Sequence, residues 1–153
     1  MKSFNYGFNN IHLIGIEGLK QSSIIKLLER AAFFNSQKRN KKNKILKDCL
    51  VINLFFENST RTKASFEIAA KSMSADILNI SVLTSSIKKS ETLIDTASTL
   101  NAMHPDFLIL RHPNSGAAEM LSKHVQCSII NAGDGRHEHP TQALLDAAVI
   151  KEK

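Results

Sequence analysis

Short apolar runs alternate with longer amphipathic stretches along most of this chain. Residues 49–56 form a nearly unbroken apolar run, as expected for a strand that is covered on both faces. Downstream, apolar residues from Ala64 to Met73 recur at roughly helical spacing. The same alternation continues, and it predicts strands at residues 48–56, 76–80, 107–111 and 127–132. It predicts helices at 22–35, from the 59–62 turn onward, around 93–100, at 119–125 and from about 140.

Strands that alternate with helices indicate an α/β fold in which a parallel sheet lies between helical layers. We therefore predict a three-layer α/β/α arrangement with a four-stranded parallel sheet. A length of 153 residues suits a single domain. We expect any ligand to bind beyond the carboxyl ends of the strands, because open parallel sheets bind ligands at that edge.

Polar loops follow all four predicted strands and would meet at that one edge. The loops are residues 57–62, 81–89, 111–112 and 133–142, and their cationic and neutral donors outnumber their carboxylates. This balance favours a small anionic substrate. No glycine-rich nucleotide loop follows the first strand, which argues against ATP or NAD chemistry.

The stretch Ser59, Thr60, Arg61 and Thr62 joins the first predicted strand to a helix. The first amides of a helix lack partners within the helix and carry partial positive charge, which suits a phosphate. The three hydroxyls and the guanidinium add donors at the same place. The alternative is a plain helix cap, since Ser and Thr are common in that position.

The net charge of +6 has a local origin. Six of the twenty basic residues lie in residues 38–47, and the other fourteen equal the fourteen acidic residues in number. A basic run can bind nucleic acid, but no aromatic residue is interleaved with it for base stacking. A solvated connection is therefore favoured, and we expect no nucleic-acid partner.

The remaining composition favours a cytoplasmic protein. No apolar run approaches the roughly 20 residues that span a bilayer, so we expect no membrane association. The first residues lack the features of a secretory signal. Cys49 and Cys127 have no metal-ligand spacing and fit a reducing compartment.

His137, Glu138 and His139 suggest a metal site at first sight. Two histidines two residues apart share a face only on a strand, whereas the neighbouring glycines indicate a loop. A loop histidine that donates a hydrogen bond is the favoured alternative, and we expect no metal and no cofactor.

Several motifs carry a resemblance to a known family. Residues 56–67 (FENSTRTKASFE) resemble the carbamoyl-phosphate signature shared by aspartate and ornithine carbamoyltransferases. Residues 131–135 (NAGDG), 139–146 (HPTQALLD) and 88–92 (KKSET) resemble the aspartate enzymes in particular. The similarity extends from about His12 to the carboxyl terminus, and it implies the N-terminal half of the aspartate/ornithine carbamoyltransferase fold.

The resemblance implies a role for each residue of the first motif. Ser59, Thr60, Arg61 and Thr62 would hold the phosphate of carbamoyl phosphate, and Arg61 and Thr62 would also take part in catalysis. The reaction implied is attack by the amine of L-aspartate on the carbamoyl carbon, which gives N-carbamoyl-L-aspartate and phosphate on the route to pyrimidines. Such chemistry depends on positioning and on stabilisation of an oxyanion.

The remaining roles fall on other loops. Arg111 would reach the phosphate and the carbonyl oxygen, His139 would donate to that oxygen, and Gln142 would hold the carbamoyl amide. Ser85 and Lys89 would enter the site of an adjacent subunit. The resemblance thereby implies a homotrimer with shared sites, to which regulatory chains can be added in this family.

Members of the family are about twice as long as this chain. The resemblance therefore assigns residues 1–153 to the carbamoyl-phosphate-binding domain, without the aspartate-binding domain, and we expect the isolated domain to be inactive. Two alternatives stay open: a phosphate- or carbamoyl-phosphate-binding module without catalysis, and an ornithine-type carbamoyltransferase.

Overall fold

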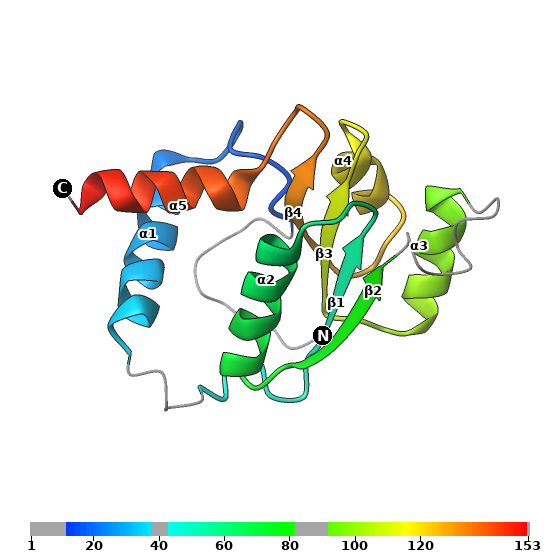
Figure 1. Cartoon of the computed structure of the whole chain (residues 1–153), viewed down its shortest axis with the longest axis horizontal. Coiled ribbons are helices and arrows are strands. Elements are labelled where there is room, and N and C mark those ends of the chain that lie inside the picture. The colour runs from blue at the N-terminus through cyan, green and yellow to red at the C-terminus, as the bar shows by residue number, and fades with distance from the viewer. Residues whose placement is uncertain (1–11, 38–42, 82–91, 153) are drawn as a thin grey trace.

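The computed structural model describes residues 12–37, 43–81 and 92–152, in which strands and helices alternate (Figure 1). The elements are, in chain order, α1 (Gln21–Ser36), β1 (Leu50–Phe55), α2 (Thr60–Ser72), β2 (Asp76–Ser81), α3 (Leu93–Ala102), β3 (Phe107–His112), α4 (Ala117–Ser122), β4 (Ser128–Asp134) and α5 (Pro140–Lys151).

The four strands form one parallel sheet in the order β2-β1-β3-β4. β1 is central and lies between β2 and β3, with Asn53 opposite both Asn79 and Ile109. Because all four strands run the same way, their carboxyl ends lie at one edge of the sheet. The prediction of a four-stranded parallel sheet is confirmed.

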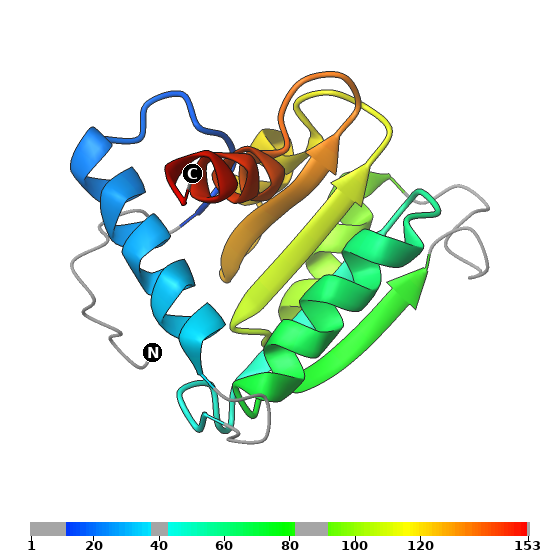
Figure 2. The same cartoon turned by 60° about the vertical axis from the view of Figure 1, so that its left-hand side comes forward.

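Helices cover both faces of the sheet (Figure 2). On one face, Val51 and Phe55 of β1 pack with Ala70 of α2. On the other face, alternate strand residues such as Leu54 and Leu108 pack against α3 and α4. This alternation follows from the period of two in a strand, and it confirms the three-layer arrangement. Helix α1 has no fully buried residue and makes its main contacts with α5.

Several predicted boundaries were wrong. The first helix begins at Gln21 after Lys20, one residue before the predicted start. The short helix predicted at 119–125 is Ala117–Ser122, because Gly116 adopts a left-handed conformation immediately before it. The last strand extends to Asp134, so two residues expected in a loop belong to β4.

The two cysteines are buried thiols, as expected, but each lies just before a strand rather than inside one. Burial raises the pKa of the Cys127 thiol to about 11. None of the helices in the described ranges is long and apolar enough to cross a bilayer.

Candidate functional site

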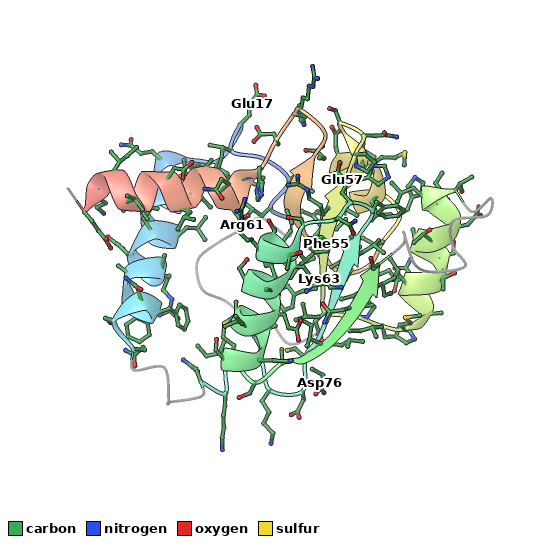
Figure 3. All side chains as sticks on the ribbon, viewed as in Figure 1. Glu17, Phe55, Glu57, Arg61, Lys63 and Asp76 are labelled. Carbon is green, nitrogen blue, oxygen red and sulfur yellow. The ribbon has the colours of Figure 1, made fainter. Side chains whose placement is uncertain are left out.

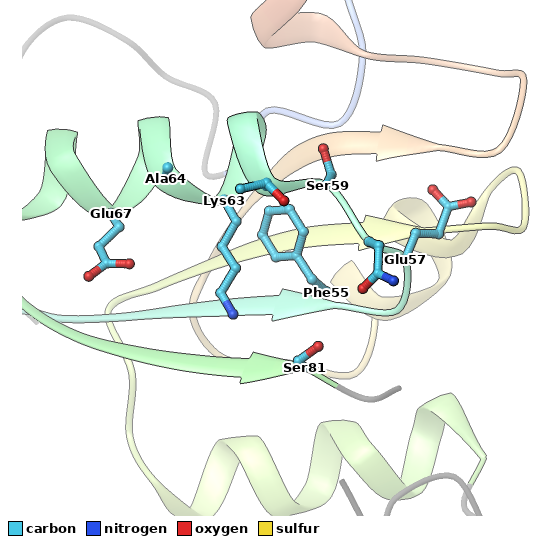
Figure 4. Close-up of a pocket in the computed structure, with 9 residues that line it drawn as sticks. Phe55, Glu57, Ser59, Lys63, Ala64, Glu67 and Ser81 are labelled. Atoms are coloured by element: carbon cyan, nitrogen blue, oxygen red, sulfur yellow. The ribbon is translucent and has the colours of Figure 1, made fainter. Parts of the chain in front are cut away.

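The start of α2 borders an open hollow of about 340 Å³ at the carboxyl edge of the sheet (Figure 4). Ser59 and Thr60 line it from the turn after β1, and Ser81 lines it from the end of β2. Two consecutive strand ends therefore meet here, as the sequence predicted. The remaining lining residues are Phe55, Glu57, Asn58, Lys63, Ala64 and Glu67.

The first turn of α2 is open to a ligand. Ser59 occupies the N-cap position, yet its side chain makes no capping hydrogen bond. The first amides of this helix therefore keep their donor capacity and their share of the helix dipole. By contrast, Thr92 at the start of α3 forms a complete capping box with Asp95. The plain-cap alternative for Ser59 is not what the structure shows.

Three charged side chains border this hollow, and two of them are carboxylates. Glu67 accepts hydrogen bonds from Lys71 and from Asn79, which lies 3.1 Å away. Glu57 accepts a hydrogen bond from Arg111. The side chain of Lys63 makes neither a hydrogen bond nor an ion pair within the described part of the chain, although its charge helps to lower the pKa of Glu67. The hollow thus offers an anion one ammonium group, which stands beside two carboxylates.

Arg111 links this hollow to a second one. Its Nε donates to Glu57 Oε2 at 3.0 Å, and its Nη1 donates to the carbonyl oxygen of Ala132 at 3.0 Å. The side chain is 26% exposed, so it is held but still reachable. Arg111 also lines a hollow of about 220 Å³ at the end of β4, together with Gly133 and His139.

A bulge between β3 and β4 makes room for this arginine. Leu110 pairs with Asn131 and His112 pairs with Asp134, so Ala132 and Gly133 lie opposite Arg111 alone. Bulges of this kind redirect side chains next to functional sites. Gly133 has a φ of +116°, and a Cβ on it would lie 2.2 Å from Arg111 Nη1. Only glycine fits that position without moving the guanidinium.

His139 immediately precedes α5, with Pro140 as the first helical residue. Burial lowers the pKa of its imidazole below the usual 6.5, and the positive charge of Arg111 lowers it further. The ring is therefore neutral at neutral pH. Its Nδ1 lies 3.3 Å from Thr141 Oγ1. When Nδ1 accepts from that hydroxyl, Nε2 carries the ring proton and can donate it.

The structure groups some of the predicted site residues and separates others. Ser59 and Thr60 border the first hollow, and Arg111 and His139 border the second. Arg61, Thr62 and Gln142 line neither of these two hollows. Gln142 is exposed and donates to Asp146 Oδ1 at 2.9 Å. Ser85 and Lys89, and the basic residues 38–42, lie outside the described residues.

Arg61 lies on the first turn of α2 (Figure 3). Residues two apart on a helix point to roughly opposite sides, so Arg61 does not share the hollow that Lys63 lines. Arg61 is exposed and forms no ion pair with a carboxylate of the described chain. Its guanidinium is free to meet an anion that approaches the helix start from the other side.

Sequence reasoning missed the residues that arrange the site. Glu57 was only the edge of a loop, yet it holds Arg111. Asn131, Gly133 and Asp134 were noticed as part of a motif, without a role. No sequence signal pointed to the bulge, because a bulge depends on the pairing of two strands.

Comparisons with known proteins agree with this geometry. The family model described as aspartate/ornithine carbamoyltransferase, carbamoyl-P binding domain, matches residues 11–152. The aspartate carbamoyltransferase catalytic subunit of Parvibaculum lavamentivorans is 58% identical over 148 residues, which cover 95% of this chain and 45% of that protein. The catalytic subunit of Jannaschia sp. is 58% identical over 146 residues, which cover 94% and 46%.

Solved structures give the same result. The catalytic subunit of M. jannaschii aspartate transcarbamoylase superposes with a TM-score of 0.83 at 36% identity, covering 94% of this chain and 47% of that one. The Trypanosoma cruzi aspartate transcarbamoylase in complex with carbamoyl phosphate and aspartate also superposes with a TM-score of 0.83 at 36% identity. The superposition covers 92% of this chain and 47% of that one.

The chain spans about half the length of the curated relatives it matches. Within that half, the match covers both hollows, the α2 start and the β4–α5 turn. The chain therefore belongs to the aspartate/ornithine carbamoyltransferase family, and it matches that family's carbamoyl-phosphate-binding domain.

Proposed function

We propose that this chain binds carbamoyl phosphate and supplies that half of an aspartate carbamoyltransferase site. The observation that carries the proposal is the α2 start, whose uncapped amides lie at the same sheet edge as Arg111 and His139. The phosphate is held by the α2 amides with Ser59, Thr60, Arg61 and Thr62. An anion at an uncapped helix start gains from both the free N–H groups and the dipole.

The carbamoyl end of the substrate faces the second hollow. Arg111 and the neutral His139 donate to the carbonyl oxygen as negative charge develops there, with Thr62 assisting. Gln142 holds the carbamoyl amide. Because Arg111 is tied to Glu57 and Ala132 before the substrate arrives, little reorganisation is needed at the moment of reaction.

The reaction joins the aspartate nitrogen to the carbamoyl carbon. The C–N bond forms, the C–O bond to phosphate breaks, and the amine loses a proton as phosphate leaves with the electron pair. No covalent intermediate with the protein is involved. The aspartate-binding groups belong to the part of the relatives that this chain does not cover, so we propose that the 153-residue chain binds carbamoyl phosphate without turnover.

The proposed assembly follows the family. We propose a cytoplasmic homotrimer in which Ser85 and Lys89 reach an adjacent subunit's site, with regulatory chains as optional partners. The buried thiols of Cys49 and Cys127 fit a reducing compartment.

Calorimetric titration of the chain with carbamoyl phosphate tests the binding claim. We expect Arg61→Ala to weaken binding about tenfold or more, because a charge-assisted hydrogen bond contributes roughly 1.5–3 kcal/mol. Arg30→Ala on α1 is the matched control, since it removes a guanidinium that lies over Phe33 and Phe34. Equal affinity in all three proteins would refute the assignment.

The acceptor amine is tested in a chimera. This chain replaces the matching 45% of the Parvibaculum lavamentivorans enzyme, and the product is assayed with L-aspartate and with L-ornithine. We expect carbamoyl transfer to aspartate. Transfer to ornithine instead would support an ornithine-type enzyme, and binding without any transfer would support a module that does not catalyse.

A further inference from the structure

The motif at the end of β4 contains two polar side chains that the proposed chemistry does not use. Asn131 and Asp134 are 0% and 1% exposed. Burying a carboxylate is costly unless hydrogen bonds and charges compensate for the lost water. The contacts of Asp134 therefore indicate what this burial achieves.

Both carboxylate oxygens of Asp134 are occupied. Oδ2 accepts from the backbone N–H of Gly116 at 2.7 Å. Oδ1 accepts from Asn131 Nδ2 at 2.9 Å and from the backbone N–H of Glu138 at 3.1 Å. His137 Nδ1 lies 3.4 Å from Oδ2. Burial acts to raise the pKa of Asp134, but these hydrogen bonds outweigh it and hold the pKa below 3.8.

The backbone of Asp134 closes the same turn. Its N–H donates to the carbonyl oxygen of Glu138 at 3.1 Å, and its carbonyl oxygen accepts from His137 N–H at 3.1 Å. Residues 134 and 138 thus form an antiparallel bridge immediately before His139. The turn that leads to His139 is held by both the main chain and the side chain of one residue.

Asn131 fixes the other side of the bulge. Its Nδ2 donates to the carbonyl oxygen of Ile14 at 2.8 Å, and its Oδ1 accepts from Gly133 N–H at 2.9 Å. Gly133 in turn leaves the space that the Arg111 guanidinium fills. The buried pair therefore reaches Arg111 and His139 through the backbone of Gly133 and Glu138, and it forms no hydrogen bond with either of their side chains.

We propose that Asp134, with Asn131 as its partner, is a positioning residue for carbamoyl transfer: it fixes the turn that presents His139 to the carbonyl end of the substrate. This inference rests on the proposed function for its substrate. The inference goes beyond the proposed function because it assigns specificity for the carbamoyl end to a residue that contacts no substrate.

The alternative is a purely structural role, and ligand selectivity separates the two. The hydrogen-bond and ion-pair partners of Asp134 include none of the residues at the start of α2. Loosening the His139 turn should therefore weaken the binding of a ligand with a carbonyl group more than it weakens the binding of phosphate alone. General destabilisation of the fold would weaken the binding of both ligands equally.

The test is Asp134→Asn in the 153-residue chain, with two ligands followed by NMR: inorganic phosphate and phosphonoacetamide, a stable carbon-linked analogue of carbamoyl phosphate. The substitution keeps the volume, but an amide NH₂ must then face an N–H donor on one side. We expect phosphonoacetamide to bind about tenfold more weakly and phosphate affinity to change less than about twofold. We also expect the pKa of His139 to rise toward 6.5, because the loosened ring loses its burial.

Asp76→Asn is the matched control, because it makes the same chemical change on an exposed residue at the start of β2 (Figure 3). It should leave both affinities and the His139 pKa unchanged. Equal loss of both ligands in Asp134→Asn, or an unchanged His139 pKa, would overturn the proposal.

Two further outcomes of the binding and folding experiments each have their own test. If the unsubstituted chain binds neither ligand, the proposed function fails, and the His139 titration alone then decides whether Asp134 holds the turn. If Asp134→Asn does not fold, hydrogen exchange in the unsubstituted chain replaces it. The amides of Gly116 and Glu138 should then exchange slowly for loop positions, and fast exchange at Glu138 would overturn the proposal.

Discussion

The turns before α2 and before α5 lie at the same edge of one sheet but are built in opposite ways. The α2 turn has an N-cap serine whose side chain makes no capping bond, and Thr60, Arg61 and Asn58 are exposed. The α5 turn is fastened by the buried carboxylate of Asp134, which accepts three hydrogen bonds. Neither N-cap side chain makes a capping bond, so the difference lies in the buried carboxylate that fixes only the α5 turn.

This difference fits a division of labour between the two ends of one substrate. A phosphate dianion brings enough charge to complete an open helix start by itself. A neutral carbamoyl group brings little charge, so the donors that meet its oxygen have to be in place beforehand. Three predictions test this contrast.

Gly133→Ala should have the largest effect, because it disturbs the pre-formed part of the site that meets the carbamoyl group. The new Cβ would lie 2.2 Å from Arg111 Nη1 and 3.2 Å from His139 Cδ2. Displacing the Arg111 guanidinium removes charge-assisted hydrogen bonds of about 1.5–3 kcal/mol each, so carbamoyl phosphate binding should weaken on the order of 10- to 100-fold. The positive φ should also cost about 1–3 kcal/mol of stability. Calorimetry and thermal unfolding measure the two effects.

Gly18→Ala separates these contributions. Gly18 also has a positive φ, of +78°, but nothing lies within 4 Å of its would-be Cβ. We expect a similar loss of stability without loss of binding. If Gly18→Ala weakened binding as much as Gly133→Ala, the collision with Arg111 would not be the cause.

Ser59→Asp should act on the open end, with opposite signs on stability and binding. A carboxylate at the N-cap should stabilise α2 by about 1 kcal/mol. It should weaken phosphate binding roughly tenfold, because the carboxylate accepts the hydrogen bonds of the first helix amides and repels the anion. Thr92→Asp is the control, since the α3 start is already capped. Tighter phosphate binding by Ser59→Asp would place the anion elsewhere.

The pH dependence of stability should be the smallest effect. Burial lowers the pKa of His12, His112 and His139 below 6.5. Below pH 6.5 the unfolded chain therefore takes up protons that the folded chain resists. We expect the free energy of unfolding to stay level above pH 7 and to fall as the pH drops from 6.5. Urea unfolding at several pH values measures this, and a chain that is more stable at pH 5.5 than at pH 7 would contradict it.

The contrast between the two turns also explains which parts of the site were predictable. The α2 start was found from the sequence, because an apolar run followed by Ser, Thr and Arg signals a strand, a turn and an anion in one local stretch. His139 and Arg111 were named through the family resemblance, and the structure brings them to one hollow. Their supports were not found, since Glu57 lies 54 positions from Arg111 in the sequence.

By itself the sequence determined the order of strands and helices and the parallel sheet, because hydrophobic periodicity and turn residues act over a few positions. It also placed the polar loops of the described residues at one edge of that sheet. Only the tertiary structure decided the bulge opposite Arg111, the space at Gly133 and the three donors gathered on Asp134. Each of these depends on segments that meet after the strands have paired, where hydrogen-bond geometry rather than local pattern selects the arrangement.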